Sequence, residues 1–81
     1  MDGKNYSDLL EALELNIAVI IVAVIKDGTL IDWAVASEYS TLQHARSKHD
    51  EWPEDAQLQL LYGLDALLMY GPSVPEVSPN P

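Results

Sequence analysis

A run of β-branched residues in the first third of the chain predicts a β-strand. Seven of the nine residues at positions 17–25 are Ile or Val, and branched side chains fit a pleated strand better than a helix. Asp27-Gly28 follows this run, and such a pair favours a type I′ turn, in which both central residues have positive φ. We therefore expect a β-hairpin whose second strand covers residues 29–37. The alternative is one long helix over residues 7–26, which the β-branching disfavours.

The two-residue turn also determines which side chains share a face of the hairpin. It pairs Ile25 with Leu30 and Val22 with Trp33. One face is then expected to carry Ile20, Val22, Val24, Ile31, Trp33 and Val35. The other, alanine-rich face carries Val19, Ile21, Ala23, Ile25, Leu30, Ala34 and Ala36, interrupted by Asp32.

Both predicted faces are apolar and need to be covered, since a two-stranded hairpin alone is marginally stable in water. Helices can supply that cover, or a second copy of the chain can pair with the edge of the sheet or stack on the alanine-rich face. We therefore predict a homodimer. The predicted oligomer interface consists of Val19, Ile21, Ala23, Ala34 and Ala36.

An amphipathic helix is predicted before the hairpin, over residues 6–15. Apolar side chains spaced three or four residues apart share one face of a helix. Here that face carries Tyr6, Leu9, Leu10 and Leu13. Asn5 or Ser7 can cap the first turn, and Asp8 favours the positive end of the helix dipole.

Two further helices are predicted after the hairpin. The first begins at Ser40, which has capping-box spacing to Gln43. The second begins at Trp52-Pro53, because proline is favoured at the first helical position, and ends before Gly71. Its apolar stripe is Leu60, Leu61, Leu64, Leu67 and Leu68.

Gly63 lies inside the second of these predicted helices. Glycine costs about 1 kcal/mol relative to alanine within a helix. We therefore expect another segment to pack closely against this position.

Together these elements predict one α+β domain with the order α-β-β-α-α. An all-α three-helix bundle is the alternative. The compact domain is expected to cover residues 1–71, and the proline-rich segment 72–81 is expected to be an extended tail. A chain of 81 residues buries only ~60% of its unfolded surface, which also favours self-association.

The charge balance is strongly acidic, with thirteen Asp and Glu residues against four Lys and Arg and a net charge of −9. Such a field repels nucleic acids and anionic membranes and attracts a basic protein surface. We therefore expect a protein partner rather than direct nucleic-acid or membrane binding. The alternative is that the charge serves only to keep the protein soluble.

Composition and targeting signals point to the cytoplasm. The absence of cysteine excludes disulfides and cysteine-based zinc sites. The first ten residues lack the pattern of a signal peptide. The longest uncharged run, residues 15–25, is shorter than the ~20 residues that a membrane-spanning helix needs.

No residue pattern predicts catalysis, a cofactor or a metal site. The two histidines, His44 and His49, are five residues apart, whereas metal-binding pairs on a helix are spaced by three or four. The serines lie in no recognisable nucleophile motif, and the four glycines are too scattered to form a phosphate-binding loop. We therefore predict that the protein is not an enzyme.

Two groups of acidic residues are the predicted partner-binding sites. Asp8, Glu11 and Glu14 are spaced three apart, so their side chains form a ridge with neighbours about 5–6 Å apart. We call these three residues the acidic ridge. The second acidic group comprises Asp50, Glu51, Glu54 and Asp55. Alternatively, these residues only stabilise helix N-termini and hydrate the surface.

The small size, the acidity and the lack of known motifs give this chain a profile similar to phage-encoded inhibitors of host defence, such as anti-CRISPR and anti-restriction proteins. This resemblance implies a protein that blocks a basic, nucleic-acid-binding surface of its partner. It extends to no motif and assigns no role to any residue. The alternatives are a self-associating structural or accessory protein, or a small chaperone- or antitoxin-like adaptor with an exposed apolar groove.

Overall fold

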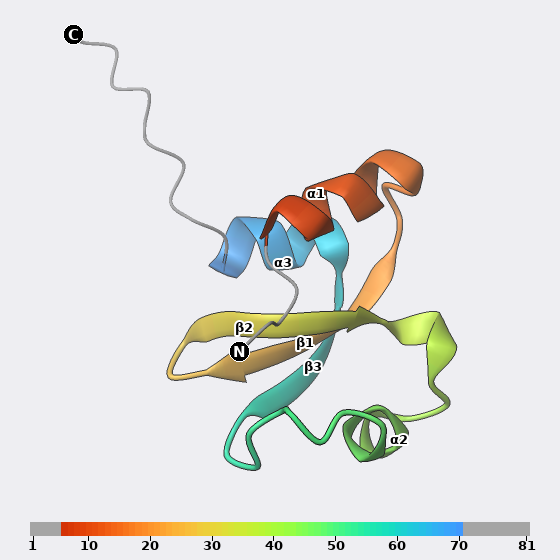
Figure 1. Ribbon diagram of the computed structural model, residues 1–81. Coiled ribbons are helices and arrows are strands. Elements are labelled where there is room, and N and C mark those ends of the chain that lie inside the picture. Colours follow the sequence, from red (N-terminus) through yellow and green to blue (C-terminus); the bar gives the residue numbers. More distant parts are fainter. Residues whose placement is uncertain (1–5, 71–81) are drawn as a thin grey trace, which may run out of the picture.

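Three antiparallel strands form the centre of the fold, and helices lie on both faces of the sheet (Figure 1). The computed structural model describes residues 6–70. In chain order the elements are α1 (Tyr6–Leu15), β1 (Ile20–Lys26), β2 (Thr29–Val35), the 3-10 helix η1 (Ala36–Glu38), α2 (Leu42–Ser47), β3 (Gln57–Tyr62) and α3 (Gly63–Tyr70). The strand order is β2-β1-β3. The predicted α+β class is confirmed, and the all-α alternative is wrong.

The sheet separates two apolar cores. α1 and α3 cover one face, whereas α2 and the segment 49–56 cover part of the other (Figure 1). The buried residues on the α1–α3 side are Leu9, Leu13, Val19, Ile21, Ala23, Ile25, Leu30, Trp33 and Ala66. Those on the α2 side are Val22, Val24, Ala34, Ala45, Trp52 and Ala56. Because the central strand β1 contributes to both cores, its sequence is a continuous apolar run rather than an alternating one.

The predicted hairpin turn is confirmed. Asp27 and Gly28 have φ values of 53° and 76°, as a type I′ turn requires. Next to the turn, Ile25 pairs with Leu30, also as predicted.

Beyond that pair, the predicted register is wrong because β2 contains a bulge. Ile31 is the extra residue, so that Val24 pairs with Asp32 and Val22 pairs with Ala34. A bulge places one additional residue on one strand and moves the following side chains to the opposite face. Trp33 therefore points into the α1–α3 core.

The predicted alanine-rich face does not exist as one surface. Ile21 and Ala23 lie on the α1–α3 side, whereas Ala34 and Ala36 lie on the α2 side. Val19 joins the first pair, and all of these residues except Ala36 are buried within the chain.

The prediction of one long last helix is also wrong. Residues 57–62 form strand β3, and the helix α3 covers only Gly63–Tyr70. The leucines at positions 58 and 60 alternate with Gln57 and Gln59, a period-2 pattern that a strand can use. Antiparallel pairing with β1 selects this pattern, and the element order becomes α-β-β-α-β-α.

The close approach expected at Gly63 is confirmed at the junction between β3 and α3. A Cβ added there would lie 2.9 Å from Val19 Cγ1 and 3.2 Å from Leu13 Cδ2. The Gly63 N–H also donates a 2.7 Å hydrogen bond to the Val19 carbonyl. A residue without a side chain is therefore what allows the chain to pass from the sheet into α3 at this position.

The first two helices follow the sequence closely. α1 has the predicted bounds, and it buries Leu9 and Leu13, although Leu10 is 49% exposed. α2 is capped by Thr41 rather than Ser40, since Thr41 Oγ1 accepts a 2.9 Å hydrogen bond from the His44 N–H. The predicted cap Asn5 and the tail 72–81 lie outside the described residues. No helix between residues 6 and 70 has the length and apolar character needed to cross a bilayer.

Candidate functional site

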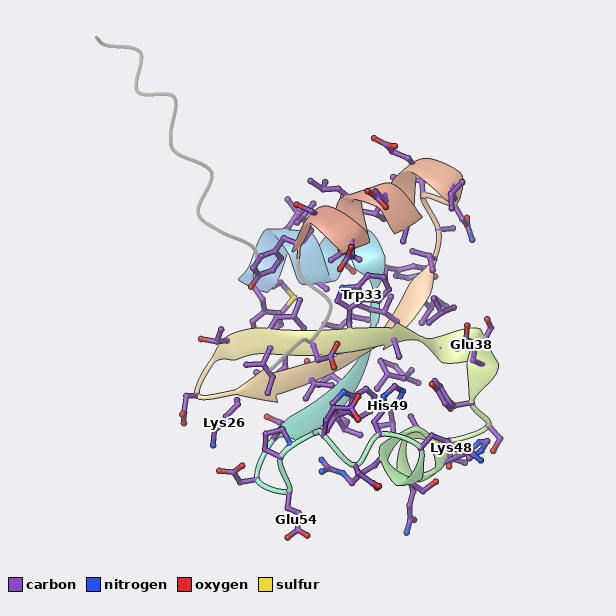
Figure 2. All side chains as sticks on the ribbon, viewed as in Figure 1. Lys26, Trp33, Glu38, Lys48, His49 and Glu54 are labelled. Atoms are coloured by element: carbon purple, nitrogen blue, oxygen red, sulfur yellow. The ribbon has the colours of Figure 1, made fainter. Side chains whose placement is uncertain are left out.

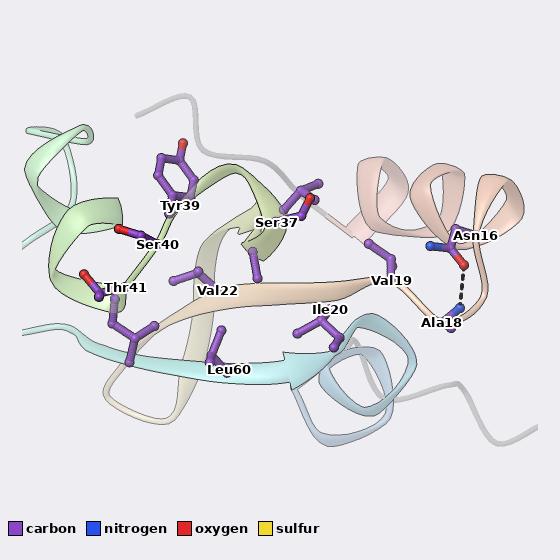
Figure 3. Close-up of a pocket in the computed structure, with 13 residues that line it drawn as sticks. Asn16, Ala18, Val19, Ile20, Val22, Ser37, Tyr39, Ser40, Thr41 and Leu60 are labelled. Carbon is purple, nitrogen blue, oxygen red and sulfur yellow. Dashed lines mark hydrogen bonds between the residues drawn. The ribbon is translucent and has the colours of Figure 1, made fainter.

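An apolar hollow of about 440 Å³ opens on the α2 side of the sheet (Figure 3). Its floor includes Ile20 and Val22 of β1 and Leu60 of β3, and its wall includes Tyr39 and Leu42. None of the thirteen lining residues is an acid, a base or a histidine, although the chain as a whole has a net charge of −9.

The hollow exists because α2 is too short to cover the whole face of the sheet. Near α2, Val24 and Ala34 are buried beneath Trp52 and Ala45. At the far end, Ile20 of β1 remains 44% exposed. Leu60 of β3 is 58% exposed beside it. Apolar strand residues that lack cover are the part of this face most suited to a ligand or partner.

Polar groups lie around the rim of the hollow. Ser37, Ser40 and Thr41 contribute hydroxyl groups, and Figure 3 shows Ser40 and Thr41 beside Tyr39. Asn16 lies at the opposite end, where its Oδ1 accepts a 3.0 Å hydrogen bond from the Ala18 N–H. The hollow thus combines an apolar floor with hydrogen-bonding groups at its margin, the composition that binding pockets commonly have.

A cluster of aromatic and histidine side chains supports the wall. Tyr39 Oη lies 2.7 Å from His49 Nε2, and His49 Nδ1 lies 2.9 Å from the Glu51 carboxylate. The imidazole of His49 stacks on Trp52, with ring centroids 4.1 Å apart and planes 6° from parallel. These contacts connect the hollow's aromatic wall residue to the segment 49–56.

Two ionisable groups of this cluster have shifted pKa values. The hydrogen bond with His49 lowers the pKa of the Glu51 carboxyl from its usual value. Burial raises the pKa of the Tyr39 hydroxyl, and the nearby carboxylates of Glu38 and Glu51 raise it further. Both groups already have a hydrogen-bonding neighbour within the cluster, because the Tyr39 hydroxyl and the Glu51 carboxylate each contact a ring nitrogen of His49.

Asp32 anchors this cluster to the sheet. Among residues 6–70 it is the one charged residue that is buried, at 5% exposed. Its carboxylate accepts 2.7 Å hydrogen bonds from Trp52 Nε1 and the Trp33 N–H. Figure 2 shows His49 and Trp33 on opposite sides of the sheet, and Asp32 belongs to strand β2 of that sheet. A buried carboxylate needs such donors, so the β2 bulge that turns Asp32 toward Trp52 also positions the wall of the hollow.

Arg46 provides a second link within the same wall. Its guanidinium donates hydrogen bonds to the carbonyls of Pro53 (2.9 Å) and Ala56 (2.7 Å). The only arginine of the chain therefore fastens α2 to the segment that leads into β3.

The two predicted acidic groups lie on opposite sides of the sheet. Asp8, Glu11 and Glu14 are exposed on α1, whereas the second group lies between α2 and β3. They cannot form one continuous row of carboxylates.

Half of the second acidic group is paired within the chain. Asp55 forms a 2.6 Å ion pair with Lys26, which lowers the pKa of the Asp55 carboxyl. Glu51 contacts His49. Asp50 and Glu54 are exposed. No cluster of three or more potential metal ligands occurs among residues 6–70.

Sequence reasoning missed the hollow and its principal residues, Ile20 and Leu60. It assigned Leu60 to the stripe of a helix and Ile20 to a covered hairpin face. The alternation of leucine and glutamine at positions 57–60 was the available signal, because it predicts a strand with one apolar face.

No family model matches this chain, and no curated protein or solved structure matches it either.

Proposed function

We propose that this chain is a non-enzymatic, cytoplasmic protein-binding module whose hollow receives apolar side chains of a basic partner segment. The observation that carries this proposal is the uncharged, partly exposed lining of the hollow in a chain of net charge −9. Apolar surface at Ile20 and Leu60 supplies the hydrophobic contribution to binding, roughly 25 cal/mol per Å² buried.

The shape of the hollow favours a protein segment over a small molecule. Sites for small ligands usually enclose most of the ligand surface. Here, Ile20 and Leu60 remain open to solvent, which suits side chains that project from a larger partner.

The surrounding charge favours basic residues in that segment. Glu38 lies between the lining residues Ser37 and Tyr39. Asp65 lines a smaller depression that shares Ile20 and Leu60 with the hollow. A lysine or arginine next to the inserted apolar side chains would meet these carboxylates, and the acidic field of the chain would accelerate its approach.

The proposal can be tested by filling the hollow. A display library of random peptides would be selected against the wild-type protein, and the recovered peptide would be titrated by fluorescence anisotropy. Ser37→Trp, which places an indole at the rim, should weaken binding by about tenfold or more, ~1.4 kcal/mol. Gln43→Trp is the matched control, because Gln43 is exposed on α2 but does not line the hollow.

The selected sequences are informative in themselves. They should combine apolar residues with lysine or arginine. Peptides without an apolar centre, or binding that is equally strong to the Ser37→Trp protein, would contradict the proposal.

The acidic ridge supports a second candidate function, the inhibition of a partner with a basic, nucleic-acid-binding surface. The specific observation is that Asp8, Glu11 and Glu14 are all exposed on one helix. Their spacing of about 5–6 Å approximates a row of phosphates. In this candidate the ridge takes the place of nucleic acid on the partner.

Neutralising the acidic ridge tests this candidate. The variant Asp8→Asn/Glu11→Gln/Glu14→Gln should bind a Lys/Arg-rich peptide more weakly and with a smaller dependence on salt, because three charges are lost from one surface. Asp27→Asn/Asp50→Asn/Glu54→Gln removes the same charge from exposed positions elsewhere. If both triple variants weaken binding equally, net charge alone explains it and the ridge has no special role.

A further inference from the structure

The geometry points to a second copy of this chain as the partner of strand β3: two β3 strands pair antiparallel, joining two sheets of three strands into one of six. This inference concerns the backbone edge of the sheet; it shares Leu60 with the floor of the hollow but does not depend on what the hollow binds. Of the two contacts expected from the sequence, it takes the sheet edge and not the alanine-rich face, whose residues are largely buried within one chain.

The outer side of β3 presents unpaired backbone groups. In an antiparallel ladder, successive residues direct their N–H and C=O groups alternately to one neighbour and then the other. The Gly63 N–H donates to the Val19 carbonyl (2.7 Å) in the register of the β1–β3 ladder, so the odd-numbered residues of β3 face β1. Leu58, Leu60 and Tyr62 therefore direct their backbone groups outward. No other strand within residues 6–70 pairs with that side.

The two edges of the sheet differ in how well they are protected against pairing with a strand of another molecule. Natural edge strands commonly avoid association through bulges, inward-pointing charges or prolines. The edge strand β2 has a bulge at Ile31 and the buried charge of Asp32. The edge strand β3, with the sequence QLQLLY, has no charge, no proline and no register shift against β1. Of the two edges, β3 is the one suited to further pairing.

Charge also favours this side as the contact between two copies. Two molecules of net charge −9 repel each other unless they meet through a surface that carries little charge. Residues 57–70 include a single charged side chain, Asp65. The ridge on α1 and the segment 49–56 hold most of the other described carboxylates, so this approach keeps them apart.

A two-fold axis perpendicular to the sheet makes the pairing self-complementary. Such an axis leaves the helices α1 and α3 of both copies on the same side of the joined sheet. Residues that lie opposite each other must then direct their side chains to the same face, so even-numbered residues of β3 pair with even-numbered residues. With the axis at Leu60, this residue lies opposite its own copy, and Leu58 lies opposite Tyr62 of the partner subunit. Leu60 and Tyr62, which are 58% and 54% exposed in one chain, would then each gain an apolar neighbour across the axis.

The pairing also determines where the helices and the hollows lie. α3 covers the same face of the sheet as α1, and the hollow opens on the other face. Pairing through β3 therefore places both α3 helices on one face of the joined sheet and both hollows on the opposite face.

Cysteine cross-linking tests the pairing, because the natural chain contains no cysteine. Residues directly opposite in a hydrogen-bonded antiparallel pair have Cα atoms about 5.5 Å apart, within the range of roughly 4.4–6.8 Å that a disulfide spans. Under mild oxidation, Leu60→Cys should double in mass on a non-reducing gel. Leu10→Cys is the control, since Leu10 is similarly exposed, at 49%, but lies on α1.

Sedimentation equilibrium provides an independent measurement. The wild-type protein should have twice the chain mass of 9.0 kDa. Leu60→Lys should reduce this to one chain, with unchanged circular dichroism, whereas Leu10→Lys should leave it doubled. A wild-type protein that remains a single chain at all concentrations overturns the inference. It is equally overturned if Leu60→Lys stays doubled, or if both cysteine variants cross-link to the same extent.

Discussion

Replacing Trp52 with alanine is expected to destabilise the fold by about 3–5 kcal/mol, the usual cost of removing a buried aromatic side chain. The indole is 3% exposed, stacks on His49 and donates a hydrogen bond to the buried carboxylate of Asp32. The loss would leave both a cavity and a weakened set of donors around that carboxylate. Urea unfolding followed by circular dichroism measures the difference.

This cost is large relative to the stability of so small a domain. At roughly 0.05–0.15 kcal/mol per residue, a chain of this length is stable by about 4–12 kcal/mol. Trp52→Phe is the matched control, because it keeps most of the ring and removes the hydrogen bond to Asp32, which should cost about 1–3 kcal/mol. A Trp52→Ala protein within 1 kcal/mol of wild type would show that the segment 49–56 is not part of the cooperative fold.

Replacing Gly63 with valine is the second large effect, with an expected loss of about 3 kcal/mol from overpacking. Even the Cβ atom would lie 2.9 Å from Val19 Cγ1 and 3.3 Å from Leu9 Cδ1. Both neighbours are buried, and the β-branched Val19 has little rotamer freedom to move away. The same unfolding measurement applies.

A double-mutant cycle distinguishes this close contact from a general effect on the helix. Val19→Ala removes the nearest methyl group, so Gly63→Val should cost at least about 1 kcal/mol less in the Val19→Ala background than in the wild type. Simple additivity of the two changes would contradict steric crowding as the cause.

The two sites of greatest expected sensitivity act on different parts of the molecule. Gly63 controls how β3 and α3 join the α1–α3 core. Trp52 holds the segment that, through His49 and Tyr39, supports the wall of the hollow. A Trp52 variant that remains folded should therefore also bind a hollow-directed peptide more weakly, whereas Gly63 variants should affect stability first.

Features that depend on neighbouring residues could be predicted from the sequence. The bounds of α1 follow from the spacing of its apolar residues. The hairpin turn follows from the tolerance of Asp27 and Gly28 for positive φ. Glycine at position 63 predicts a close approach, although the prediction placed it inside a helix and the structure places it at the start of α3, against Val19.

Features that depend on distant partners could not be predicted. The leucines at positions 58–68 fit the period of a helix, and those at positions 58 and 60 also fit the period of a strand. Pairing with β1 decides that residues 57–62 form a strand. The bulge at Ile31 likewise depends on a distant group, because Asp32 receives a hydrogen bond from Trp52, twenty residues away.

For the candidate site, the sequence by itself determined the charge of the chain and the exposure of its acidic ridge, since charged side chains rarely leave water without a partner. The tertiary structure alone decided that the two acidic groups lie on opposite sides of the sheet. It also decided that α2 leaves Ile20 and Leu60 uncovered and that β3 forms an unprotected edge. A local pattern shows which side chains avoid water, but whether they are covered depends on which segments meet across the fold.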